Sequence, residues 1–78
     1  MQTIYVVETY QQSEGELWPE RAVICRSDDD ARSRALFMAD SAVGVIAYSQ
    51  EVAPDAGDYR SPVVLARYGA VPVECRPG

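Results

Sequence analysis

Four short runs of the chain are rich in β-branched and aromatic residues, at 4–10, 21–26, 45–52 and 62–68. Runs of this length, bounded by polar or proline-containing segments, predict β-strands. The polar segment 11–15 and Pro19 separate the first two runs, so we expect a hairpin with a long connection. Residues 54–57, Pro-Asp-Ala-Gly, suit the turn of a second hairpin, because proline favours an early turn position and glycine tolerates a positive φ.

A helix is predicted between the second and third runs. Ser27 precedes three aspartates at 28–30. A serine hydroxyl can accept a backbone N–H of the first turn, and negative charge is favourable at that end of the helix dipole. The segment up to Ser41 consists mainly of good helix formers, and Gly44 is expected to end the helix because glycine adopts the left-handed conformation without strain.

The element order is therefore ββαββ, which predicts an α+β fold with a four-stranded antiparallel-type sheet and one helix packed on one face. Residues 1–70 are expected to form a single domain, followed by an extended tail at 71–78 that contains two prolines. Two arrangements stay open: the third strand could run parallel to the second through a right-handed crossover, or the first strand could lie between the two hairpins.

Alternation within the predicted strands produces two apolar faces, and one helix can cover only one of them. An alanine-rich stripe on the helix is expected to lie on an aliphatic face of the sheet. The stripe consists of Ala31, Ala35, Met38, Ala39 and Ala42. The aliphatic face consists of Ile4, Val6, Val45, Ala47, Val63 and Leu65. The opposite face consists of Tyr5, Val7, Ile46, Tyr48, Val64 and Tyr68.

The three tyrosines of the second face, Tyr5, Tyr48 and Tyr68, predict an interaction surface, because tyrosine combines a large apolar ring with a polar tip and is enriched at protein contacts. The alternative is a half-solvated sheet stabilised by cross-strand pairs. This assignment assumes that no bulge shifts a strand by one residue.

Leu36 and Phe37 lie beside or off the alanine stripe and add to the apolar surplus. They are expected either to meet another chain or to be partly covered by Trp18 and the tail. A domain of 78 residues buries only about 60% of its unfolded surface, so a second subunit, a disulfide or a metal would add needed stability.

Charge and composition exclude several classes of function. Twelve acidic residues oppose seven scattered arginines, giving a net charge of −5, which argues against nucleic acid and anionic membrane surfaces as partners. The chain contains no His and no Lys, so it has no Ser-His-Asp triad, no imidazole metal ligand and no Schiff-base lysine. Without a run of about 18 apolar residues or a leader-like start, we expect a cytoplasmic protein.

Three local features invite chemistry, and each has a simpler explanation. The aspartates at 28–30 point about 100° apart on a helix, so capping explains them better than a cation site. The acidic segment 55–58 lacks the remaining positions of a calcium loop and is predicted to be a plain turn. Cys25 precedes the helix start and could be a reactive thiol, although the nearby aspartates oppose this and a packed cysteine is the alternative. Pairing of Cys25 with Cys75 stays open.

The second half of the chain resembles small uncharacterised bacterial proteins of similar length. The resemblance is carried by a GxIAxS-type strand at 44–49, a Pro-Asp-x-Gly turn at 54–57 and a VLAR-x-G-x-VP ending at 64–72. It implies no activity and no functional residue.

We therefore expect a non-catalytic protein without cofactor or metal that self-associates, most simply as a homodimer, through the tyrosine face or the surface around Leu36 and Phe37. The first alternative is a small adaptor that binds a peptide of another protein at a sheet edge or at the tyrosine face. The second alternative is a thiol or redox protein that uses Cys25.

Overall fold

The computed structural model describes residues 2–53, 58–59 and 62–71 of the chain. Its elements are β1 (Gln2–Ser13), β2 (Glu16–Cys25), α1 (Asp28–Met38), β3 (Gly44–Ala53), β4 (Asp58–Tyr59) and β5 (Val63–Gly69). All strand pairs within this part of the chain are antiparallel, and one helix accompanies the sheet. The predicted α+β class is confirmed, whereas the two-residue strand β4 was not predicted.

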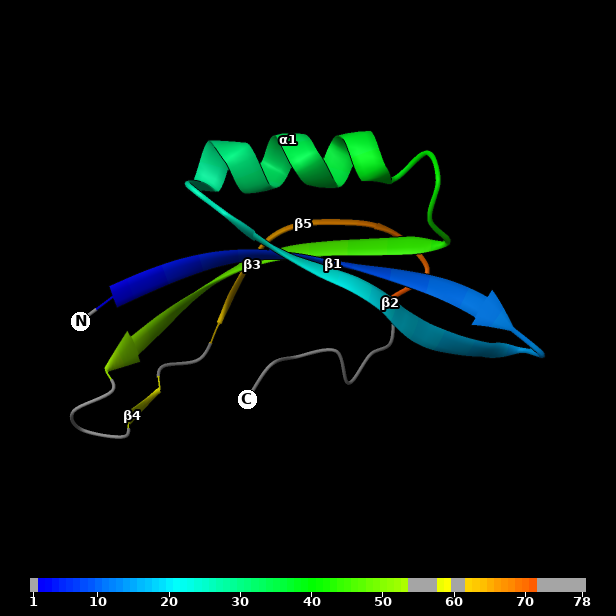
Figure 1. Cartoon of the computed structure of the whole chain (residues 1–78), viewed down its shortest axis with the longest axis horizontal. Helices are drawn as coiled ribbons and strands as arrows, with labels where there is room; N and C mark the ends of the chain where they lie inside the picture. The colour runs from blue at the N-terminus through cyan, green and yellow to red at the C-terminus, as the bar shows by residue number, and fades with distance from the viewer. Residues whose placement is uncertain (1, 54–57, 60–61, 72–78) are drawn as a thin grey trace.

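The sheet has the order β2-β1-β3, and β4 and β5 both pair with the remaining side of β3. β1 lies between β2 and β3, which is one of the two arrangements that the sequence left open. Because β1 is antiparallel to both neighbours, β2 and β3 run in the same direction. The chain passes from β2 to β3 through α1, which lies along one side of the twisted sheet (Figure 1).

The first hairpin is tighter than its sequence predicts. β1 and β2 continue to the pair Ser13 and Glu16, and only Glu14 and Gly15 form the turn, with φ angles of 52° and 82°. Two consecutive positive φ angles suit the right-handed twist of paired strands. Pro19 is accommodated inside β2 because this strand lies at the edge of the sheet and pairs irregularly there. The prediction of a long loop at 11–15 is therefore wrong.

The helix begins as predicted and ends earlier. Ser27 is the N-cap, and its hydroxyl accepts the backbone N–H of Asp30 at 3.1 Å. The last turn closes at Ala39, which keeps a right-handed conformation, so Gly44 is not the cap. Gly44 instead begins β3 opposite Gly69, where a Cβ atom on Gly44 would lie 1.6 Å from the carbonyl oxygen of Ala70. The close approach of the Ala70 backbone explains why a residue without a side chain stands at this position.

The core between sheet and helix is built from small side chains on α1. Ala31 and Ala35 are fully buried against Val7, Val45 and Ala47 of the sheet. Partly buried residues of the same stripe pack around them, namely Met38, Ala39 and Ala42. The predicted alanine stripe is therefore confirmed, and its short side chains allow α1 to lie close to the strands.

Strand register overturns the predicted faces of β1. Val7 pairs with Ala47 and Tyr5 with Ser49, so Tyr5 and Val7 share the helix side. Val6 pairs with Tyr48 on the opposite side. The prediction was wrong because cross-strand partners share a face, and a sequence does not state which residues are partners.

β5 contains a bulge. Ala47 pairs with Ala66, but Tyr48 pairs with Val64, which leaves Leu65 as an extra residue. Leu65 and Ala66 consequently both pack toward the helix-side core, and Tyr68 packs there as well. A single inserted residue thus exchanges the two faces of the strand.

The opposite side of the sheet is also closed at its centre. Ile46 is fully buried there, and Val6, Tyr10 and Tyr48 are less than 9% exposed. Because one helix covers one side of a sheet, the opposite side was predicted to be open. That prediction is wrong for the middle of the opposite side. The turn predicted at 54–57 and the tail at 72–78, including Cys75, lie outside the described residues.

Candidate functional site

The three tyrosines predicted to form one interaction surface lie on different sides of the sheet. Tyr5 and Tyr68 pack against the helix-side core. Tyr48 lies on the opposite side and is 8% exposed. The predicted tyrosine surface is therefore wrong, because the β1 register and the β5 bulge separate its members.

Tyr48 instead belongs to a buried polar cluster. Its hydroxyl donates to Glu8 Oε2 at 3.0 Å, and the hydroxyl of Tyr10 donates to Glu8 Oε1 at 3.1 Å. Buried tyrosine hydroxyls normally have a hydrogen-bond partner inside the protein, so these contacts are part of the internal packing and not of an interaction surface. Sequence reasoning missed Tyr10 and Glu8, although their spacing of two residues on one strand places them on the same face.

Apolar exposure is concentrated elsewhere. Leu36 and Phe37 on α1 are 61% and 81% exposed, and Trp18 on β2 is 54% exposed. Trp18 pairs with Gln11 near the end of the first hairpin. Leu36 and Phe37 are therefore largely exposed, and their predicted partial cover by the tail falls outside the described residues.

A groove of about 440 Å³ runs between α1 and β5. It is lined by Arg32, Ser33 and Leu36 of the helix and by Leu65, Ala66, Arg67 and Tyr68 of the strand. The walls thus combine apolar side chains, of which Leu36 is exposed, with two arginines. The side chain of Arg32 also forms an ion pair with Asp28 one turn earlier on α1.

Leu36 and Phe37 do not share this groove. Successive helical residues are turned by about 100°, which places Phe37 toward the other flank of α1. Phe37 is absent from the residues that line the groove, whereas Leu36 is among them. The predicted Leu36 and Phe37 surface therefore divides, and only Leu36 adjoins the sheet edge.

The two outer strands differ in how their edges are protected. β2 carries Pro19 and the charged residues Glu16, Glu20 and Arg21, although it also exposes Trp18 and Ile24. Both outer strands pair irregularly at one point. β5 carries one charge, Arg67, and exposes Val63 and Val64 at 59% and 43%. Within the described residues β5 pairs only with β3. An apolar strand edge that lacks a second neighbour, as β5 does among the described residues, is a template for a further strand.

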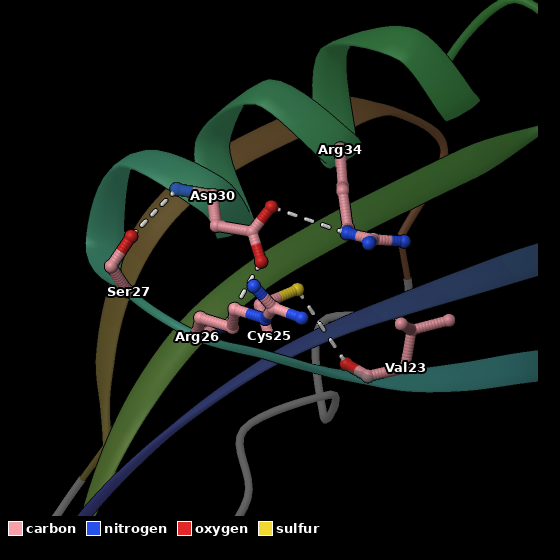
Figure 2. A network of polar contacts seen from close by, with 6 residues as sticks. All are labelled: Val23, Cys25, Arg26, Ser27, Asp30 and Arg34. Carbon is pink, nitrogen blue, oxygen red and sulfur yellow. Dashed lines mark hydrogen bonds and ion pairs between the residues drawn. The ribbon is translucent and has the colours of Figure 1, made fainter.

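Cys25 lies at the end of β2 beside the start of α1. Figure 2 shows its sulfur near the Val23 carbonyl, below the Asp30 and Arg34 side chains. Asp30 accepts the backbone N–H of Arg26 at 2.9 Å and the side chain of Arg34 at 3.3 Å (Figure 2). The backbone N–H of Arg26 and then the Arg34 contact lower the pKa of Asp30. The acidic triplet thus serves the helix start, as predicted.

Burial and the nearby Asp30 carboxylate raise the pKa of the Cys25 thiol above its ordinary value of 9.0. The thiol is free and 7% exposed. A raised pKa reduces the thiolate fraction at neutral pH, and the thiolate is the reactive form. The geometry therefore favours a packed cysteine over the redox alternative.

We expect Cys25 in a Cys75→Ser variant to react slowly with a maleimide at pH 7 and rapidly once the chain is unfolded in urea. The folded state holds the proton more tightly than the unfolded chain. This tighter proton binding stabilises the folded state fully at pH values below the pKa of the unfolded thiol. The stabilisation is lost as the pH rises through the pKa of the folded thiol. Rapid labelling of folded protein at pH 7 would contradict the assignment.

Among residues 2–53, 58–59 and 62–71, no three acidic or thiol side chains are placed to hold a metal ion. In this same portion, no helix has the length and apolar character required to cross a membrane. Comparisons with protein-family models, curated proteins and solved structures found no match to this chain.

Proposed function

We propose that this chain is a non-catalytic protein that self-associates as a twofold dimer through the edge of β5 and the groove between α1 and β5. One observation carries the proposal: the groove, which contains both apolar and charged side chains, lies directly beside a strand that pairs on one side only within the described residues. A second copy can add its own β5 to this edge and cover the groove of the first copy at the same time.

A twofold arrangement suits this surface because an antiparallel pair of identical strands is self-complementary. Each copy presents the same edge and the same groove, so one contact closes both. Leu36 supports this arrangement as an exposed apolar group on the flank of α1 nearest to β5. β5 carries fewer charges than β2 and no proline, which favours this edge over the other.

Leu36→Arg is expected to weaken the dimer. Each copy loses one buried leucine, and two leucines at about 1.5 kcal/mol each correspond to an increase in Kd of about 100-fold. Sedimentation velocity between micromolar and millimolar concentration measures the shift from dimer to the 8.6 kDa monomer.

Phe37→Arg is the matched control, because it makes the same change at the adjacent and more exposed position outside the groove. It is expected to leave the dimer Kd unchanged. A wild-type protein that is monomeric throughout this concentration range would overturn self-association. Equal weakening by both substitutions would overturn the assignment to the groove.

The adaptor alternative uses the same edge. The observation that favours it is the pair of arginines in the groove, Arg32 and Arg67, because they suit an extended peptide with acidic residues beside an apolar one. A monomeric wild type whose Leu36 and β5 amide signals shift on titration with such a peptide would support the adaptor over the dimer.

A further inference from the structure

The side of the sheet opposite to α1, the far side, is buried along a central band of β1 and β3. The band consists of four residues that are less than 9% exposed, namely Val6, Tyr10, Ile46 and Tyr48. A sheet face without a second layer leaves the outer surfaces of its largest side chains in solvent. Two tyrosines buried on such a face therefore require a cover.

The cover is narrow. Ile24 of β2 is the cross-strand neighbour of Val6 and is 67% exposed. Val64 of β5 is the neighbour of Tyr48 and is 43% exposed. Protection thus ends within one strand spacing, about 5 Å, on each side of the band. A helix about 10–12 Å wide would cover these neighbours too, whereas a single extended segment fits the band.

The described elements do not supply this cover. Among residues 2–53, 58–59 and 62–71, all strands belong to one sheet, and α1 packs on the other side through Ala31 and Ala35. The exposure values are those of a single chain. The cover therefore belongs to this chain and lies outside the ranges above.

The chain beyond Val71 starts at the right place and has sufficient length. β5 ends at Gly69 opposite Gly44, and Gly44 pairs with Tyr10 at one end of the band. Val6, at the other end, lies four residues further along β1, or about 13 Å. Seven residues follow Val71, and seven extended residues span up to about 25 Å.

The other stretches outside the described ranges are too short. Residues 54–57 connect Ala53 to Asp58, which pair with each other. Tyr48, the nearest residue of the band, lies five residues before Ala53, or about 17 Å. Four residues span at most about 14 Å and cannot reach the band and return. Residue 1 and residues 60–61 are shorter still.

The composition of residues 72–78, Pro-Val-Glu-Cys-Arg-Pro-Gly, suits this role. Val73 and Cys75 are two residues apart, so they project to the same side of an extended chain. Glu74 and Arg76 project to the other side. Such a segment can place an apolar side on Ile46 and its neighbours while its charged side remains in solvent. The two prolines favour an extended backbone.

We infer that the far side of the sheet is the docking surface for the chain's own residues 72–78, which lie along the band with Val73 and Cys75 toward the sheet. This inference is independent of the proposed dimer, which uses the β5 edge and the groove beside α1. It also separates the two cysteines, because Cys25 packs with the helix-side core and Cys75 lies on the far side.

Nuclear Overhauser contacts of the Val73 methyl groups in the full-length protein test the placement. Contacts with Ile46 and Tyr48 are expected. Contacts with Ala35 instead, or none with the sheet, would overturn the inference. A mixture of isotope-labelled and unlabelled protein shows whether a contact forms within one chain. A contact found only between differently labelled chains would overturn docking of the chain's own segment.

Alanine substitution tests which side of the segment faces the sheet. Val73→Ala removes two methyl groups from the docked side and is expected to raise the equilibrium constant of unfolding about tenfold. Glu74→Ala is the matched control on the solvent side, with an expected change of less than about twofold. Urea unfolding at one fixed protein concentration compares the two variants. Equal effects would contradict the proposed orientation.

Thiol oxidation gives a third readout in the wild-type chain. A disulfide requires two Cα atoms within about 7 Å, which a sheet between the two thiols prevents. Under mild oxidation at a concentration where sedimentation shows the monomer, the folded protein is therefore expected to keep both thiols free. Formation of a Cys25–Cys75 disulfide within one folded chain would refute docking on the far side and leave the proposed dimer standing.

Discussion

Replacing Gly44 with alanine is expected to destabilise the protein by about 3 kcal/mol or more. An added Cβ would lie 1.6 Å from the carbonyl oxygen and 2.5 Å from the carbonyl carbon of Ala70. These are backbone atoms at the end of the β3 and β5 ladder, so a side-chain rotation cannot relieve the overlap. Forced overpacking typically costs about 1–3 kcal/mol, and a rigid backbone neighbour places this site at the upper end.

Urea unfolding followed by circular dichroism measures this effect at one fixed protein concentration, since dimerisation alters apparent stability. Gly15→Ala is the control: Gly15 has a φ of 82° but no atom within 4 Å of an added Cβ. Only conformational strain opposes that substitution, at about 1–2 kcal/mol. Equal losses for the two variants would show that Gly44 is required for some reason other than close backbone approach.

Ile46→Ala is expected to cost about 2–5 kcal/mol, the range for a fully buried isoleucine. Ile46 is 0% exposed although it lies on the side of the sheet opposite to α1. A small domain has a stability of about 5–15 kcal/mol, so this loss is a large fraction of the whole. The variant therefore tests whether the second side of the sheet is a real core.

Ile24→Ala is the matched control, because the same side chain is removed from a position on β2 that is 67% exposed. A change of less than about 0.5 kcal/mol is expected there. Differential scanning calorimetry at one concentration compares the two. An Ile46→Ala variant as stable as Ile24→Ala would show that the far side of the sheet is open to solvent.

The proposed dimer would cover a different apolar surface from the one predicted by counting the faces of the sheet. Counting apolar faces predicts that the sheet needs a second cover, but the middle of its far side is buried within the chain. Exposed large apolar groups remain on α1 and along β5, namely Leu36, Phe37, Val63 and Val64, and on β2, namely Trp18 and Ile24. Of these, Leu36 adjoins a groove and an edge together. Nothing described in the structure covers Phe37.

Local chemistry allowed parts of the fold to be predicted. Ser27 and the aspartates after it place the helix start, because their preference for that position depends on backbone groups one turn away. The alanine stripe follows from helical periodicity alone. The positions of β3 and β5 follow from dense β-branched composition. The absence of histidine and lysine from the chain likewise excludes particular catalytic groups without any structure.

The candidate site depended on tertiary structure. Which side of the sheet Tyr5, Tyr48 and Tyr68 occupy was decided by the β1 register and by the extra residue Leu65 in β5. Pairing between strands distant in sequence sets these features, and a shift of one residue exchanges the faces. For the same reason, the purpose of Gly44 emerged only when Ala70 was seen against it. The sequence determined the helix start, the buried face of the helix and the approximate positions of the longer strands, whereas packing between distant segments decided the strand faces and which surfaces remained exposed.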